Sequence, residues 1–128
     1  MNDTISLHVL CRFDGMTPKG LVLVDKSSWT YDAVSWRVSE DDIPALIGKT
    51  FCMHQSKAEP SYRGGTILAI RREPIPDNDG EVRAIVRFQA TKEASGLAWP
   101  PTDNPNEYHR VNREVPISEL IKLGKSRA

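Results

Sequence analysis

The segment from Ile5 to Phe13 alternates apolar and other residues more regularly than any other part of the chain. Every second residue is apolar, and the residues between them include a serine, a histidine and an arginine. A repeat of two residues is typical of a β-strand with one face in a core, whereas a helix needs a longer repeat. The sequence therefore predicts a half-buried strand at the start of the chain.

Further short segments are rich in β-branched and aromatic residues and are separated by turn-forming residues, so we expect them to be strands. They are residues 21–24, 34–38, 50–54, 66–72 and 82–89. The last two are expected to form an antiparallel hairpin. In its second strand Val82, Ala84, Val86 and Phe88 are expected to face the core.

Two short helices complete the predicted elements. Ser39 is followed by acidic residues and Pro44, a pattern typical of a capped helix start, and Gly48 is expected to end that helix. The second is expected at Ser118 to Leu123, ended by Gly124. The predicted class is α+β with β dominant, in a small curled sheet or partial barrel.

With 128 residues, 39% of them hydrophobic, the chain is expected to be a single domain over 1–128, with 125–128 as a disordered tail. No apolar run approaches the about 20 residues that span a bilayer, and the first residues do not resemble a signal peptide. We therefore expect a cytoplasmic protein without membrane association. Cys11 and Cys52 lie among apolar neighbours, which predicts buried free thiols.

Polar and aromatic side chains gather directly after the predicted strand at 50–54. They are His54, Gln55, Ser56, Lys57, Glu59, Tyr62 and Arg63. Gly64 and Gly65 are expected to let the backbone turn sharply into the next strand. Such a group between two strands is typical of a recognition site on a scaffold.

The order of parts from Val34 to Leu123 resembles the PUA-like superfamily, especially its EVE and ASCH branches. Those domains carry a helix ending in Gly-Asp-x-Val before a strand, then a Gly-Ile-x-Gly-Ile strand, and close with Pro-Val-Pro-Leu-x-Glu-Leu. The matching stretches here are Ile47 to His54, Gly64 to Ile70, and Arg113 to Leu120. Lys49 stands where the family usually has an acidic residue, and the amino-terminal part matches poorly.

The resemblance implies a pseudo-barrel of about five or six strands with two or three short helices. It also implies a pocket that recognises a modified or flipped nucleobase in DNA or RNA. Such a pocket needs a ring for stacking and polar groups for the base edge. The residues that we expect to bind the ligand are His54, Gln55, Ser56, Lys57, Tyr62, Arg63, Trp29 and Trp99. Trp36, within a predicted strand, is expected to fill the core.

Arginines on the predicted hairpin offer a phosphate track at Arg71, Arg83 and Arg87. The alternative is a solvated face balanced by Glu73 and Glu81, and the sequence leaves both interpretations open. The 17 basic and 17 acidic residues give a formal net charge of zero. Because the arginine track would neutralise only a few phosphate charges, nucleic-acid binding is expected to be weak and salt-sensitive.

Two other functions remain open. A small ASCH-type amidohydrolase acting on a nucleoside-like substrate would use Lys57 and Glu59, and a protein-interaction module would use the loop at 91–110. We favour binding without catalysis and expect neither a cofactor nor a metal. Cys52 and His54 could bind a metal together, but the sequence offers no second pair.

Overall fold

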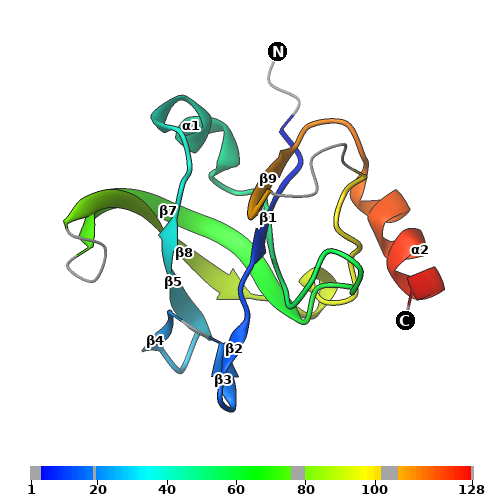
Figure 1. The fold of residues 1–128 in the computed structure, drawn as a ribbon, viewed down its shortest axis with the longest axis horizontal. Coiled ribbons are helices and arrows are strands. Elements are labelled where there is room, and N and C mark those ends of the chain that lie inside the picture. Colours follow the sequence, from blue (N-terminus) through cyan, green and yellow to red (C-terminus); the bar gives the residue numbers. More distant parts are fainter. Residues whose placement is uncertain (1–3, 19, 76–79, 102–106, 128) are drawn as a thin grey trace.

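The computed structural model describes residues 4–18, 20–75, 80–101 and 107–127 (Figure 1). Within them, seven strands form one mixed sheet in the order β4-β5-β8-β7-β6-β1-β9, and only β1 and β6 are parallel neighbours. The strands are β1 (Ser6–Leu10), β4 (Leu21–Asp25), β5 (Thr30–Trp36), β6 (Thr50–His54), β7 (Arg63–Ile75), β8 (Glu81–Ala90) and β9 (His109–Asn112). A separate ribbon pairs β2 (Phe13–Asp14) with β3 (Thr17–Pro18).

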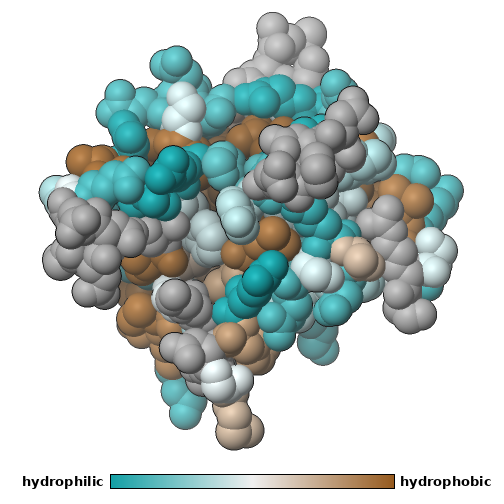
Figure 2. Space-filling model, viewed as in Figure 1, coloured by the Kyte–Doolittle hydropathy of each residue, from teal (hydrophilic) through white to brown (hydrophobic). Residues whose placement is uncertain are grey.

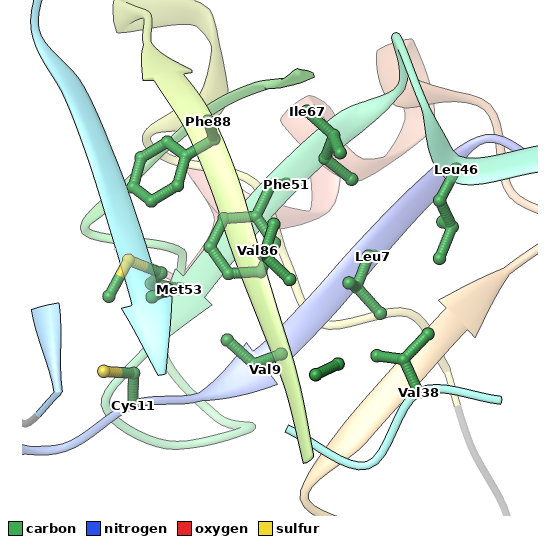
Figure 3. Packing of buried hydrophobic residues seen from close by; sticks show 12 residues of the cluster. Leu7, Val9, Cys11, Val38, Leu46, Phe51, Met53, Ile67, Val86 and Phe88 are labelled. Atoms are coloured by element: carbon green, nitrogen blue, oxygen red, sulfur yellow. The ribbon is translucent and has the colours of Figure 1, made fainter. Parts of the chain in front are cut away.

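The sheet is strongly curled. Three strands separate β5 from β1, so in a flat sheet the two would lie about 19 Å apart. Instead, buried side chains from β1, β5, β6, β7 and β8 form one hydrophobic cluster (Figure 3). The rings of Phe51 on β6 and Phe88 on β8 lie 4.9 Å apart at its centre. The predicted β-dominated α+β class is confirmed, although the main sheet of the described residues has seven strands and does not close.

The predicted helix before β6 is present. It consists of a 3-10 turn, η1 (Glu40–Asp42), followed by α1 (Ile43–Leu46). The hydroxyl of Ser39 accepts a backbone N–H of the first turn at 3.3 Å, and Pro44 lies where its missing N–H costs no helical bond. Gly48 follows with a φ of 82°, a left-handed conformation that favours glycine.

A second layer covers the outer face of β1 and β6. It is built by the 3-10 turn η3 (Lys92–Ala94), the extended chain after it and the helix α2 (Ile117–Arg127). Cys52, Leu97 and Leu120 form its buried cluster. Because of this layer, Ser6 and His8 are as fully buried as the core residues of β1. The expectation of a half-buried first strand was therefore wrong, since the second layer comes from the distant end of the chain.

Both cysteines are buried free thiols, as predicted. Burial raises the pKa of Cys11 and raises that of Cys52 to about 12. A buried thiol whose pKa is raised carries almost no thiolate at neutral pH, so neither side chain is activated as a nucleophile.

Gly64 and Gly65 do not form the expected turn but lie within β7. A Cβ at Gly64 would lie 1.9 Å from the backbone oxygen of Phe51, and one at Gly65 would lie 1.8 Å from that of Gln89. These glycines therefore let β7 pass closely between β6 and β8 at this point, which a side chain would prevent.

Gly124 does not end the last helix, which continues to Arg127. A Cβ at Gly124 would lie 2.0 Å from the backbone oxygen of Gly96, so this glycine lets α2 pack directly on the chain below it. Residues 125–127, expected in a disordered tail, belong to the helix, and Ala128 lies outside the described residues. None of the helices in the described part of the chain is long and apolar enough to cross a bilayer.

The long hairpin of β7 and β8 confirms the predicted antiparallel pairing but extends further than predicted. Ala84, Val86 and Phe88 face the core as expected, whereas Val82 is 46% exposed. Val82 lies near the tip of the hairpin, beyond the end of the core, so the alternating pattern continues there without burial.

The edge strand β4 exposes an unusual amount of apolar surface. Val22, Leu23 and Val24 are 54%, 47% and 43% exposed. Apolar residues are correspondingly visible in Figure 2 over the region where Figure 1 draws β4. Exposed edge strands can pair with other chains, and proteins usually shorten or charge them; here Asp25 ends a strand of 5 residues.

Candidate functional site

A chain of hydrogen bonds runs through the buried space shared by β1, β6 and β9. Nδ2 of Asn112 donates to Oγ of Ser6 at 3.0 Å, and that hydroxyl lies 2.8 Å from Nε2 of His8. Nδ1 of His8 lies 2.9 Å from Nε2 of His54, whose Nδ1 lies 3.1 Å from the backbone oxygen of Glu59. The four side chains involved are at most 2% exposed.

With both imidazole rings neutral, only one arrangement of protons satisfies the chain. The carbonyl oxygen of Glu59 can only accept, so Nδ1 of His54 donates and its Nε2 accepts from His8. The other nitrogen of His8 then accepts the proton of Ser6, whose oxygen accepts from Asn112. Burial and, next, the neighbouring ring of His54 hold the pKa of His8 well below its usual value. His8 is therefore neutral at physiological pH.

Trp99 lies against the histidine pair. Its ring makes edge contacts with His54 and His8, with centroid distances of 5.1 Å and 6.0 Å, and it is 2% exposed. Its Nε1 donates to Glu107 at 2.8 Å, and Nζ of Lys57 lies 5.9 Å from its ring centroid. The ligand-binding predictions for Trp99 and His54 thus fall on side chains closed off from solvent, because the second layer packs over them.

Tyr62, the leading predicted stacking ring, is half-buried. Its hydroxyl donates to the backbone oxygen of Cys11 at 2.5 Å, and its ring makes an edge contact with Phe13 at 5.0 Å. Burial is the main cause that raises the pKa of Tyr62. Gln55 accepts the backbone N–H of Phe13 at 3.1 Å, and Ser56 is also half-buried. These contacts attach the loop after β6 to the ribbon of β2 and β3.

Arg63 and Trp29 do not join that group. The guanidinium of Arg63 lies 5.3 Å from the ring of Tyr31 on β5. Trp29 is 53% exposed in the turn before β5, with a φ of 53°. Of the three predicted stacking rings, it is the most exposed.

Arg71 and Arg87 of the predicted phosphate track share one carboxylate. Asp32 accepts from Arg71 at 3.0 Å and from Arg87 at 2.9 and 3.1 Å. Desolvation alone would raise the pKa of Asp32, but the bonds from both arginines outweigh it and the pKa is lowered. Arg71 also binds Glu73 at 3.0 Å. The ion pair expected with Glu73 is thus present, and phosphate contact at this face stays a prediction.

A hollow of about 910 Å³ opens where the end of β5 and the start of β8 face β9. It is lined by Leu10, Trp36, Arg37, Arg83, Glu107, Tyr108, His109, Arg110, Val111 and Arg113. Its volume is in the range of ligand pockets, about 300–1,000 Å³. Of the predicted site residues, only Arg83 lines it.

Four arginines line this hollow beside one acidic residue, Glu107. Each arginine has a carboxylate partner, and two of them share one. The pairs are Arg37 and Arg83 with Glu81, Arg110 with Glu107, and Arg113 with Asp42. Four guanidiniums against three carboxylates leave one positive charge in excess. In a chain of zero formal net charge, this is a local basic site.

Aromatic and unpaired polar groups add to the hollow. Trp36 packs against the core cluster and also lines the hollow, while Tyr108 is 67% exposed. Nε1 of Trp36 and Nε of Arg83 are buried donors without a hydrogen-bond partner in the described part of the chain. Desolvation, the largest cause, lowers the pKa of His109. This hollow therefore combines ring surface, positive charge and donors that a ligand can satisfy after small side-chain movements.

Sequence interpretation missed this site. Trp36 was assigned to the core, which is half correct, and Arg37, Arg110 and Arg113 were not singled out. Trp36 and Arg110 lie far apart in the chain and meet only because the curled sheet brings β9 opposite the end of β5. Two local signals pointed to it: an aromatic residue followed by a cation at Trp36–Arg37, and the long loop at 91–110, whose last residues line the hollow.

No protein-family model matches this chain, and the comparisons with curated proteins and with solved structures found no match either. The described residues contain no group of three or more His, Cys, Asp or Glu that could hold a metal ion. The inference of function therefore rests on the hollow and its side chains.

Proposed function

We propose that this chain is a PUA-like module that binds nucleic acid and reads a modified or flipped base, or a similar planar heterocycle, in the hollow beside Trp36. The order of the sequence parts supports the family. The curled sheet supports the pseudo-barrel, since Leu10 near one edge of the sheet and Trp36 toward the other line the same space. The hollow would then be the opening between the two ends of the sheet.

One observation supports the proposal above all others. A hollow large enough for a nucleotide has Trp36 and Tyr108 in its lining together with four arginines. Aromatic rings bind the π-face of any base, and guanidiniums bind phosphate oxygens in pairs. The whole chain has equal numbers of acidic and basic residues, so this gathering is not a by-product of a basic chain.

The existing ion pairs do not prevent phosphate binding. Arg37 and Glu81 are 66% and 46% exposed and 3.4 Å apart, and such exposed pairs contribute little to stability. A phosphate can therefore take over donors of Arg37 at small cost. With one excess positive charge, we expect weak affinity that falls with salt.

The test is a fluorescence-anisotropy titration of labelled single-stranded and duplex oligonucleotides, with and without base modifications, at low and at physiological salt. Tyr108→Ala removes an exposed ring and should weaken binding about fivefold or more, since stacking contributes about 1–3 kcal/mol per base. Lys26→Gln is the control, because Lys26 lies in the turn at the other end of β5 from Trp36.

Two results would count against the hollow as the site. Absence of binding to every oligonucleotide at low salt would remove the proposed function altogether. Loss of binding in Tyr62→Ala with full binding in Tyr108→Ala would return the site to the loop after β6. Thermal unfolding of each variant checks that the protein is folded, because Tyr62 is half-buried.

A further inference from the structure

A second hollow of about 220 Å³ adjoins the first along β9. It is lined by Pro100, Pro101, Arg110, Val111, Asn112, Arg113, Glu114 and Val115. Arg110, Val111 and Arg113 line both hollows. Two arginines therefore stand at the junction between a space that fits a nucleotide and a smaller neighbouring space.

We propose that the two hollows together bind a strand of at least two linked nucleotides, with the linking phosphate between Arg110 and Arg113. This inference rests on the proposed function and names its ligand as single-stranded nucleic acid rather than a free nucleotide. A base with its sugar occupies the larger hollow beside Trp36, and part of the next nucleotide occupies the smaller one.

The arrangement of the arginines supports this placement. Arg110 and Arg113 lie three positions apart at the end of β9, a span of about 10 Å for an extended chain. Arg110 is held at this position by Glu107 at 3.2 Å and by the backbone oxygen of Pro101 at 3.2 Å. The Arg113 side chain is 48% exposed, with Asp42 as its partner. Both cations are thus oriented, and Arg113 remains accessible.

The edge of the sheet also permits a strand to pass here. Within the described residues β9 pairs only with β1, so its other edge is not covered by a strand. The smaller hollow is too small for a whole nucleotide, since ligand pockets begin at about 300 Å³. We therefore interpret the smaller hollow as an extension of the larger one rather than as a separate site.

The experiment compares a nucleoside 5′-monophosphate, the dinucleoside monophosphate of the same base and a single-stranded octamer. Affinity is measured by NMR chemical-shift titration over a range of salt concentrations. We expect the dinucleotide to bind about tenfold tighter than the mononucleotide. Arg113→Gln should weaken the dinucleotide about three- to tenfold and the mononucleotide less, because only the dinucleotide has a linking phosphate between Arg110 and Arg113. It should also lower the salt slope for the octamer by about 0.7, the value for one phosphate contact on a single strand.

Glu114→Gln removes a negative charge from the smaller hollow. It should therefore raise the affinity for the dinucleotide and the octamer and leave that for the mononucleotide unchanged. Lys26→Gln should change none of the affinities. Equal binding of mononucleotide and dinucleotide, or an Arg113→Gln variant with wild-type affinity for both, overturns this inference but leaves the proposed function standing. No binding of any ligand overturns both.

Discussion

Acid should destabilise this protein well before its carboxylates become protonated, because His8 is buried in its neutral form. The pKa of His8 in the folded protein lies well below that of an exposed histidine, about 6.5. Between these two values the unfolded chain binds a proton that the folded protein does not. The free energy of unfolding therefore falls as the pH falls below about 6.5, and it levels off below the folded pKa.

The magnitude follows from linkage. One histidine that is neutral throughout when folded, and that has a pKa of about 6.5 when unfolded, lowers the free energy of unfolding by about 1.4 kcal/mol between pH 7.5 and 5.5. His109, whose pKa is also lowered, adds to the fall in the same window. Asp32, with a lowered pKa, stabilises the fold fully above its unfolded value of about 3.9 and loses that contribution only below it, so Asp32 adds nothing to the fall between pH 7.5 and 5.5.

The assay is urea unfolding followed by tryptophan fluorescence at half-unit pH steps, with the slope against urea checked for constancy. His109→Gln removes the other histidine with a lowered pKa, and most of the fall in the free energy of unfolding should remain in this variant. In His8→Leu the free energy of unfolding should fall less between pH 7.5 and 5.5. At pH 7.5 this variant should be less stable than the wild-type protein, because Ser6 and His54 each lose a hydrogen-bond partner. Each loss should cost on the order of 1–3 kcal/mol. A free energy of unfolding that is flat from pH 7.5 to 5.5 in the wild-type protein would refute the burial of His8 in its neutral form.

Two further predictions concern packing. Gly65→Ala should destabilise the protein by on the order of 2–4 kcal/mol in urea unfolding, because the new Cβ would meet the backbone oxygen of Gln89 at 1.8 Å. Gly80→Ala, with open space around it and a φ of 75°, should cost only about 1–2 kcal/mol, and equal effects would contradict the close-packing explanation. Cys11 and Cys52 should not react with a disulfide reagent at pH 8 in the native protein, and both should react in urea. Rapid labelling of the native protein would show that the two thiols are not buried.

Local sequence patterns predicted the elements whose structure depends on neighbouring residues. β6 spans Thr50–His54 as expected. The first helix begins at the cap formed by Ser39 and at Pro44, and it ends before Gly48, which has a left-handed φ. These features are decided within a few residues of each position, so one sequence is sufficient to find them.

Glycines were the least reliable signals. Gly64, Gly65 and Gly124 were interpreted as turns or stops, but the structure uses each for a close approach of two backbones. A glycine in a sequence shows that a side chain is absent, and it does not show whether the backbone turns or another chain passes nearby. That choice depends on elements distant in the sequence.

For the polar residues, too, the sequence predicted what depends on neighbouring residues and did not predict what depends on distant segments. The sequence placed His54 in a group of hydrogen-bonding side chains, and His8 and the backbone of Glu59 are hydrogen-bond partners of His54 in the structure. The first partner lies on another strand, and Trp99, from a third segment, covers the pair. The sequence thus predicts the chemical type of a side chain, whereas its access to solvent depends on the tertiary structure.

The sequence alone determined that the chain forms short strands, a capped helix and buried thiols, because alternation, capping and apolar neighbours act over a few residues. Only the tertiary structure decided where a ligand can enter. The hollow exists because a curled sheet brings β9 opposite Trp36, and the second layer buries His8 and Trp99. Burial and pocket shape are properties of segments that meet in space, and the order of residues along a single strand does not specify which segments meet.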